Sequence, residues 1–293
     1  MGRDSSARAA SRDDRAKQAR NTINVSIPKI LHSTPQAKRG IESAKLIVDP
    51  QAVKQVHLTS PQPNDKLSST SLGPKVTFRV ADTLAAAHDL VSSRHNPAGK
   101  VAILNMASPL RPGGGVLSGA TSQEEWLCAR TTLYPSLREE FYRLPEVGGV
   151  YTSDVLVFRR WDEAASDLPK GDWFFVDVIT AAMIRLPDVD GEGDQARYAE
   201  EKDRELAVQK MRAVLRMAAA NGVSKLVLGA WGCGAYGNPV GEVAKGWRRV
   251  LLGGRRKGKS AANSTETWDG LEVVFAIKDE KMTQRFEGHF DAA

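Results

Sequence analysis

The residues with the clearest chemical potential lie in the stretch NMASPLRPGGGVLSGATSQEEWLCAR, residues 105–130. It holds three consecutive glycines, Gly113–Gly115, and after seven further residues the triplet Gln-Glu-Glu at Gln123–Glu125. A glycine-rich turn between a strand and a helix leaves backbone N–H groups open and aims them, with the helix dipole, at an anion. Paired glutamates beside such an anion favour an enzyme over a simple binder, because like charges cost affinity.

A second turn of the same design lies in LVLGAWGCGAYGNPVGEV, residues 226–243. Here Gly232, Gly234 and Gly237 follow an apolar strand and precede a helix. Two such turns in one chain predict an extended ligand that carries more than one phosphate.

Simpler explanations of the first stretch stay open at this stage. Glycine serves any turn that needs a positive φ, so Gly113–Gly115 also fit a flexible loop. Ser122 and Glu125 have the Ser-x-x-Glu spacing of a helix capping box, in which the glutamate only returns a bond to the cap residue. The helix dipole alone also favours Glu124 and Glu125 at a helix start.

A more specific alternative interpretation exists for the second turn. It spells G-x-G-x-x-G, the dinucleotide-binding fingerprint of oxidoreductases. Against this hypothesis, the motif lies late in the α/β region instead of in its first unit. About 20 residues on, where a ribose-binding acid is expected, the chain offers only GGRRKGK. Arg255 and Arg256 would suit a 2′-phosphate instead, so this alternative stays open.

Apolar strands that alternate with amphipathic helices must position both turns. The segments with a strand pattern are 75–82, 100–108, 154–160, 172–181, 225–230 and 271–279. The segments with a helix pattern are 83–95, 122–141 with a break at Pro135, 210–222 and 238–252, the last with Asn238 as N-cap. This alternation predicts an α/β sandwich with a largely parallel sheet.

The first 74 residues have a different composition, charged and rich in Ser and Pro. We expect an N-terminal extension at 1–74, with a disordered tail, a helical piece at Arg15–Ile27 and a possible strand at Ala44–Val48. The segment TSPQPND marks a linker or loop before the main domain. Residues 75–293 are expected to form the catalytic domain, with an acidic loop between Pro187 and Glu205.

The amino-acid composition limits the classes of protein to which this chain can belong. The chain has 293 residues, 41% of them hydrophobic, and no apolar run of membrane-spanning length, which predicts a soluble globular protein. Cys128 and Cys233 lie far apart without other ligands at metal spacing, so we expect no metal, no disulfide and an intracellular, cytoplasmic or nuclear, location. The net charge of +6 suits a polyanionic partner, although RRKGK at 255–259 reads equally well as a solvated segment.

The spacing from Asn105 through Gly113–Gly115 to Gln123–Glu125 resembles the signature of the poly(ADP-ribose) glycohydrolases. The second turn, LGAWGCGAYGNP, looks like the phosphate loop of the microbial branch of that family. The resemblance extends more weakly to FRVADTLAAAHDLV and DVITAA, and so covers essentially Lys75 to the C-terminus. It implies a macrodomain-like α/β/α sandwich with a mixed, largely parallel sheet, and hydrolysis of the ribose–ribose O-glycosidic bonds of poly(ADP-ribose).

The resemblance also implies roles for individual residues. Glu125 is the acid that protonates the departing ribose oxygen and then activates water, and Glu124 positions the substrate ribose. Asp82 lies where macrodomains recognise the adenine amine, and Tyr236 covers the distal ribose or helps to order the cleft. The residues expected to bind substrate are Asn105, Gly113, Gly114, Gly115, Gln123, Gly232, Cys233, Gly234, Ala235, Tyr236, Gly237, Asn238 and Asp82.

Two other functions use the same cleft. One is a macrodomain reader that binds ADP-ribose without cutting it, and the other is a hydrolase of mono-ADP-ribosyl groups. The expected partners are poly(ADP-ribose) or ADP-ribosylated proteins, with ADP-ribose as product and no cofactor, no membrane and no direct nucleic-acid site. We expect a monomer. No long insertion of the kind found in the larger animal-type enzymes stands near the glutamates, and the resemblance to the microbial branch implies cleavage from the chain end. The stretch AAMIRLPDV departs from the Pro-rich continuation of microbial relatives.

Overall fold

The computed structural model describes residues 11–52, 73–93, 99–253 and 266–293. The predicted disordered tail in its first ten residues, the linker TSPQPND and the basic segment RRKGK lie outside these ranges.

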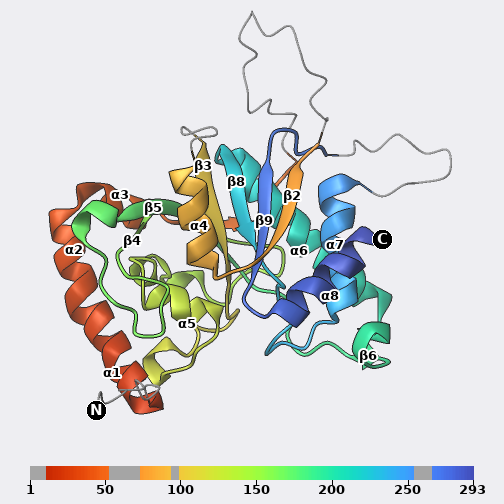
Figure 1. Cartoon of the computed structure of the whole chain (residues 1–293), viewed down its shortest axis with the longest axis horizontal. Helices are drawn as coiled ribbons and strands as arrows, with labels where there is room; N and C mark the ends of the chain where they lie inside the picture. The colour runs from red at the N-terminus through yellow and green to blue at the C-terminus, as the bar shows by residue number, and fades with distance from the viewer. Residues whose placement is uncertain (1–10, 53–72, 94–98, 254–265) are drawn as a thin grey trace, which may run out of the picture.

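A seven-stranded sheet with the order β1-β4-β5-β3-β8-β9-β2 forms the centre of the molecule (Figure 1). Its strands are β1 (Lys45–Val48), β2 (Lys75–Val80), β3 (Lys100–Met106), β4 (Gly148–Val157), β5 (Phe174–Ala181), β8 (Val223–Leu228) and β9 (Glu272–Ile277). Strands β5, β3, β8, β9 and β2 run parallel, whereas β4 and β1 are antiparallel to their neighbours. The predicted α/β architecture with a mixed, largely parallel sheet is confirmed.

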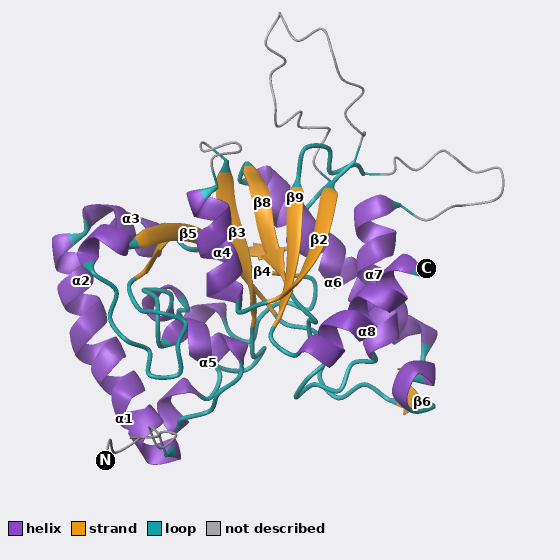
Figure 2. Cartoon of the chain, viewed as in Figure 1, coloured by secondary structure: helices purple, strands orange, loops and turns teal. Residues whose placement is uncertain are grey.

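Helices cover both faces of the sheet, as Figure 2 shows by colour. Along β3, Val101 and Ile103 pack with α4 on one face, and Ala102 and Leu104 pack with the C-terminal helices on the other. This alternation is the two-residue period of a strand that is buried on both sides. The helices are α1 (Arg12–Asn21), α2 (Ile27–Ser33), α3 (Pro35–Glu42), α4 (Thr83–Ser92), α5 (Gln123–Cys128), α6 (Glu201–Ala220), α7 (Val240–Leu252) and α8 (Glu280–Asp291).

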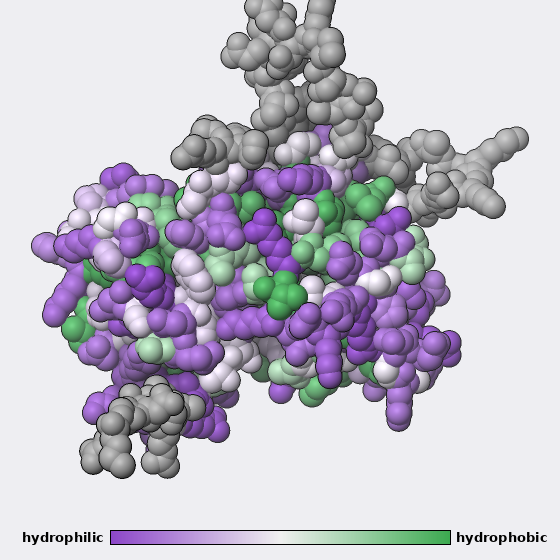
Figure 3. Space-filling view, in the orientation of Figure 1, coloured by the Kyte–Doolittle hydropathy of each residue, from purple (hydrophilic) through white to green (hydrophobic). Residues whose placement is uncertain are grey.

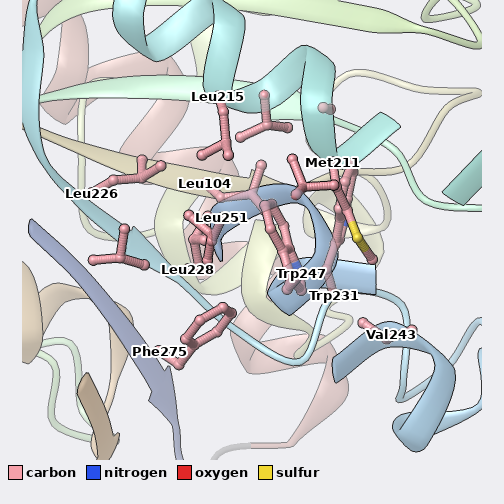
Figure 4. Packing of buried hydrophobic residues seen from close by; sticks show 14 of the residues in the cluster. Leu104, Met211, Leu215, Leu226, Leu228, Trp231, Val243, Trp247, Leu251 and Phe275 are labelled. Atoms are coloured by element: carbon pink, nitrogen blue, oxygen red, sulfur yellow. The ribbon is translucent and has the colours of Figure 1, made fainter. Parts of the chain in front are cut away.

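The larger core lies between the sheet and helices α6, α7 and α8 (Figure 4). Trp231 and Trp247 meet with ring centroids 6.1 Å apart, and Trp247 lies 6.0 Å from Phe275 on β9. Because Trp231 is also the first bulky residue after β8, its burial anchors the second glycine-rich turn to this core.

The N-terminal segment is helical over more of its length than the expected piece at Arg15–Ile27. A π-helical turn at Thr22–Ser26 joins α1 to α2, and α3 leads into β1. Strand β1 is the edge strand of the main sheet, where Lys45 pairs with Tyr151 of β4. The boundary between residues 74 and 75 stays a prediction, but β1 supplies a strand to the same sheet as the residues after it.

Three local predictions differ from the structure. The helix expected at 122–141 is only the six-residue α5, followed by short 3-10 turns at Tyr134–Ser136 and Glu139–Phe141. The predicted loop between Pro187 and Glu205 contains a small hairpin of β6 (Val189–Asp190) and β7 (Arg197–Tyr198). The N-cap of α7 is Pro239 and not Asn238, whose side chain is used elsewhere.

On the face drawn in Figure 3, hydrophobic residues gather over strands β8, β9 and β2, between helices α4 and α8. The outer parts of this face are mainly hydrophilic. Among the described helices, none is long and apolar enough to cross a membrane.

Candidate active site

Helix α5 brings Glu124 and Glu125 to the carboxyl end of β3, the edge of the sheet where the glycine-rich turns also lie. The capping box expected for Ser122 and Glu125 is not formed, because in the described chain the Ser122 side chain makes no capping bond. Instead, Glu125 Oε1 accepts a hydrogen bond from the backbone N–H of Gly115, at 2.7 Å. The glycine turn and the glutamates are therefore one site.

Glu125 is 8% exposed, and its two carboxyl oxygens have different surroundings. Oε1 is held by Gly115, whereas Oε2 is buried and has no hydrogen-bond partner among the described residues. Gly114 makes this approach possible, since a Cβ there would lie 2.5 Å from Glu125 Oε1 and its φ is +57°. One carboxyl oxygen is thus fixed by the glycine turn, and the other is held by no hydrogen bond from the described residues.

Glu124 is more deeply buried, at 2% exposure. Its Oε2 accepts from the backbone N–H of Ser108 at 2.8 Å, and its Oε1 lies 3.4 Å from Asn105 Nδ2. Burial raises the pKa of Glu124 to about 8; the bond from Ser108 opposes this rise, and the nearby charge of Glu125 adds to it. Glu124 therefore holds a proton at neutral pH.

Asn105 is fully buried at the end of β3. Its Nδ2 also donates to Thr180 Oγ1 on β5, at 3.2 Å. Within the part of the chain that the structure describes, its Oδ1 has no hydrogen-bond partner. A buried carbonyl oxygen without a partner is costly unless a ligand group supplies a donor.

Gln123, the first residue of α5, contacts the backbone of β3. Its Oε1 accepts from the N–H of Met106 at 2.9 Å, and its Nε2 donates to the carbonyl of Leu104 at 2.8 Å. Nε2 also lies 3.4 Å from Thr83 Oγ1. The amide of Gln123 is thus bonded within the protein at both ends.

The second glycine-rich turn follows β8 and is held by Asn238. Asn238 Nδ2 donates to the carbonyls of Ile184 and Gly232, at 2.7 and 3.1 Å, and its Oδ1 accepts from Tyr198 OH at 2.8 Å. A Cβ on Gly232 would lie 2.6 Å from Asn238 Nδ2, so this position requires glycine. The structure uses Asn238 to shape the turn.

Other residues of this turn face outward. Gly234, Ala235 and Gly237 are exposed, so their backbone groups are accessible to a ligand. Cys233 is largely buried, and burial raises the pKa of its thiol to about 12.

Tyr236 links the two turns. Its hydroxyl lies 3.5 Å from the carbonyl of Ala107, directly after β3, and its own carbonyl accepts from Leu186 N–H at 3.0 Å. Since β3 and β8 are neighbours in the sheet (Figure 1), Tyr236 spans the space between the two turns.

Asp82 lies at the end of β2, and both of its carboxylate oxygens are engaged. Oδ1 caps α4 by accepting from Leu84 N–H at 2.8 Å, and Oδ2 pairs with Lys278 Nζ at 3.1 Å. A cavity of about 190 Å³ opens beside them, with Met106, Trp126, Ala230 and Ile277 as apolar walls. It has the size and polarity of a slot for one flat ring.

Trp126 separates this slot from a larger cavity of about 490 Å³ that Glu125 also lines. Its ring lies 3.3 Å from Arg130 Cζ and 3.3 Å from Lys278 Nζ, a cation–π arrangement that places two positive charges near the glutamates. Burial lowers the pKa of Arg130 to about 10, which leaves it charged at neutral pH.

Helix α1 lies against the loop that carries the three glycines. Arg12 Nε donates to the carbonyl of Ser118 at 2.9 Å, and Arg15 Nε to that of Gly119 at 3.0 Å. A Cβ on Gly119 would lie 2.1 Å from the carbonyl oxygen of Arg12. The N-terminal extension thus forms part of the wall around the site.

Reasoning from sequence missed several residues of this site: Ser108, Thr180, Tyr198, Lys278 and the arginines of α1. Lys278 lies near the end of a predicted strand, as Asp82 does, and this shared position was an available signal. Tyr198 comes from a stretch without periodicity, and no local pattern indicates its contact with Asn238. Within the described ranges, no group of three His, Cys, Asp or Glu side chains gathers as ligands for a metal ion.

Known proteins match this arrangement. The catalytic-domain model of the microbial-type PARG family matches residues 33–160, which include the first turn and both glutamates. A crystal structure of poly(ADP-ribose) glycohydrolase from Thermomonospora curvata is 26% identical with a TM-score of 0.67, over 96% of this chain and 99% of that chain.

Two further structures carry ligands. The Thermomonospora curvata enzyme bound to the inhibitor ADP-HPD is 25% identical with a TM-score of 0.65, over 96% of this chain and 99% of that one. The Deinococcus radiodurans enzyme in complex with ADP-ribose is 24% identical with a TM-score of 0.61, over 88% and 96% of the two chains, a likeness that bears on the fold. A comparison with curated proteins returned no match.

Proposed function

We infer that this chain hydrolyses the ribose–ribose O-glycosidic bonds of poly(ADP-ribose), because the microbial-type PARG catalytic-domain model matches residues 33–160 and the chain is similar to a poly(ADP-ribose) glycohydrolase structure over 96% of its length. The inhibitor ADP-HPD bound to the Thermomonospora curvata enzyme supports an ADP-containing ligand as the occupant of the cleft. The dinucleotide-dependent oxidoreductase suggested by G-x-G-x-x-G does not fit the family.

The observation that carries the proposal is the unequal environment of the two adjacent carboxyls. Glu125 has one oxygen fixed by Gly115 N–H and the other without a partner among the described groups. Glu124 is kept neutral at pH 7 by its raised pKa, so it adds no negative charge beside a polyanionic substrate. A simple reader of ADP-ribose gains nothing from such a pair.

We assign the reaction steps on this basis. The proton of Glu125 passes to the oxygen of the leaving ribose as the bond from that oxygen to the anomeric carbon breaks. The anomeric carbon becomes oxocarbenium-like, and the substrate diphosphate stabilises its charge. Glu125 then takes a proton from water as the water oxygen bonds to the anomeric carbon, which restores the acid.

The remaining residues bind and orient the substrate in this proposal. The exposed backbone of Gly234, Ala235 and Gly237 suits the diphosphate. Asn105 Oδ1 lacks a donor within the described chain and would accept one from a hydroxyl of the terminal ribose. The slot beside Asp82 and Lys278 suits the adenine ring.

We propose cleavage from the chain end. Helix α1 packs on the loop before α5 through Arg12 and Arg15, and so narrows the space around the site on that side. When a terminal ADP-ribose unit is bound, the site must leave room for one neighbouring unit of the polymer, whereas an internal unit requires room for two.

The function is tested with an automodified poly(ADP-ribosyl) acceptor and identification of the soluble products by chromatography and mass. We expect monomeric ADP-ribose from the parent, and a rate at least about a thousandfold lower from Glu125→Gln. Glu287→Gln, an exposed carboxylate on α8, is the matched control and keeps the parental rate.

Other outcomes separate the alternatives. Intact polymer with ADP-ribose binding in calorimetry identifies a reader. Release of ADP-ribose only from singly modified side chains identifies a mono-ADP-ribosyl hydrolase. Oligomeric products contradict chain-end cleavage but leave the glycohydrolase activity intact.

A further inference from the structure

We infer that Gln123 is a positioning residue that completes the sheet beside β3 and thereby holds Glu124 and Glu125 in place. The inference deepens the proposed function and rests on it for its kinetic consequences. Gln123 was expected among the substrate-binding residues, and the contacts of its side chain support a different role.

Strand β8 stops pairing with β3 before β3 itself ends. Their parallel pairing ends at Ile103 and Val227, and β8 itself ends at Leu228. Beyond that point the chain turns away through Gly229, whose carbonyl accepts from Trp231 N–H at 2.8 Å. On its other side, β3 continues to pair with β5 as far as Met106 and Ala181.

The departure of β8 leaves the backbone of β3 without a strand partner on one side. The groups concerned are the carbonyl of Leu104 and the N–H of Met106, since residues two apart in a parallel strand face the same neighbour. Gln123 Nε2 donates to the first at 2.8 Å, and Gln123 Oε1 accepts from the second at 2.9 Å. The amide of the side chain replaces the peptide group of a missing β8 residue.

This replacement fixes the start of α5 relative to β3. Glu124 and Glu125 are the next two residues, and their oxygens accept from Ser108 N–H and Gly115 N–H. Helix α5 has only six residues, so it has little internal cooperativity, and contacts at its first residue matter for its orientation. The side chain of Gln123 is therefore the direct link between the sheet and the catalytic pair.

Only glutamine satisfies both backbone groups. Glutamate has the right length but no donor for Leu104, and places a carboxylate oxygen against that carbonyl. Methionine has a similar size and no strong polar group. Both hydrogens of Nε2 are used, since the second faces Thr83 Oγ1 at 3.4 Å, so no donor of Gln123 remains for a ligand.

The test compares the parent with Gln123→Met and Gln123→Glu in the full chain. Amide hydrogen exchange is read at Met106, which Gln123 bonds directly, and at Ser108 and Gly115, which report on the two carboxylates. The kcat on poly(ADP-ribose) and the Kd of ADP-ribose by calorimetry are measured on the same samples. Gln284→Glu, which makes the same charge change on exposed α8, is the control and behaves as the parent.

We expect exchange at all three amides to be at least about tenfold faster in both variants. We also expect kcat to fall about a hundredfold, because small displacements of catalytic groups have effects of this size. The Kd of ADP-ribose should stay within about threefold of the parental value, since the polar atoms of Gln123 are bonded within the protein.

Two results overturn the inference. Unchanged exchange at Ser108 and Gly115 means that Gln123 does not hold the carboxylates. A loss of ADP-ribose affinity in proportion to kcat means that Gln123 contacts the ligand directly. The exchange measurement needs no turnover, so it decides the positioning role even if the parent proves inactive on the polymer, which contradicts the proposed function alone.

Discussion

At the scale of single residues, the main feature is the raised pKa of the buried Glu124. Glu124 has a pKa of about 8, against an ordinary value of 4.5, because burial disfavours its charged form. Its folded state therefore binds a proton more tightly than the unfolded chain. The resulting stability is fully present below about pH 4.5 and is lost as the pH rises to about 8.

The direction of this pH dependence gives a prediction for Glu124→Gln, which removes the titrating carboxyl group. We expect the Tm of the parent to fall relative to that of the variant as the pH rises from about 5 to about 8, and the difference to level off above that range. Thermal unfolding of both proteins in matched buffers measures it. A Tm difference that does not change with pH contradicts the raised pKa of Glu124.

A second prediction at this scale concerns Gly114→Ala. The new Cβ would meet Glu125 Oε1 at 2.5 Å, and alanine disfavours the φ of +57° by about 1–2 kcal/mol. We expect kcat to fall at least about a hundredfold because Glu125 must move. Gly171→Ala, where no described atom lies within 4 Å of the new Cβ, is the control for both kcat and Tm.

At the scale of elements, the second turn depends on the small β6–β7 hairpin. Tyr198 of β7 donates to Asn238 Oδ1 at 2.8 Å, and Asn238 in turn bonds Gly232 and Ile184. The hairpin is itself tied to α8, because Asp194 pairs with Arg285 and with His289. The turn that we assign to the diphosphate is thus supported by residues remote from it in sequence.

We therefore expect Tyr198→Phe to lower the free energy of unfolding by about 1–2 kcal/mol, because it leaves Asn238 Oδ1 unsatisfied. ADP-ribose should bind about three- to tenfold more weakly. Denaturant titration and calorimetry measure the two effects. Tyr142→Phe removes a buried hydroxyl without a partner in the described chain, so its stability should not fall; equal losses in both variants contradict the role of Tyr198.

The helices and strands also show which parts of the fold can be predicted from the sequence. Periodicity predicts β3, β8, β9 and α4 because these segments are buried along a regular face. It overestimates α5, because Thr132 exchanges hydrogen bonds with the backbone of Leu156 on β4. That pairing is a tertiary contact, and it outweighs the local helix pattern.

In the candidate site, too, local sequence patterns predict some features and tertiary contacts determine the others. The types and order of Gly113–Gly115, Glu124 and Glu125 are visible as a local pattern. The partner of each group is not, since Gly115 N–H replaces the expected cap and Thr180 reaches Asn105 from another strand. The sequence therefore predicts the types and order of these residues, whereas their hydrogen-bond partners, Thr180 among them, are identified only by three-dimensional contacts.

At the scale of the whole molecule, net charge sets how the enzyme meets its substrate. The chain carries +6, and poly(ADP-ribose) is a polyanion, so association is steered electrostatically. We expect kcat/KM on the polymer to fall about tenfold as NaCl rises from about 20 to about 300 mM. Initial rates at low substrate concentration measure this, and kcat/KM independent of salt contradicts steering.

The position of β2 has a consequence for how the protein is made. Among the described strands, β2 pairs with β9 alone, and Lys75 Nζ meets Glu272 Oε1 across 197 residues of chain. A ribosome must therefore release nearly the whole polypeptide before β2 finds its partner. Because β9 and Lys278 also line the slot beside Asp82, a chain that terminates early lacks both the last strand and the floor of the cleft.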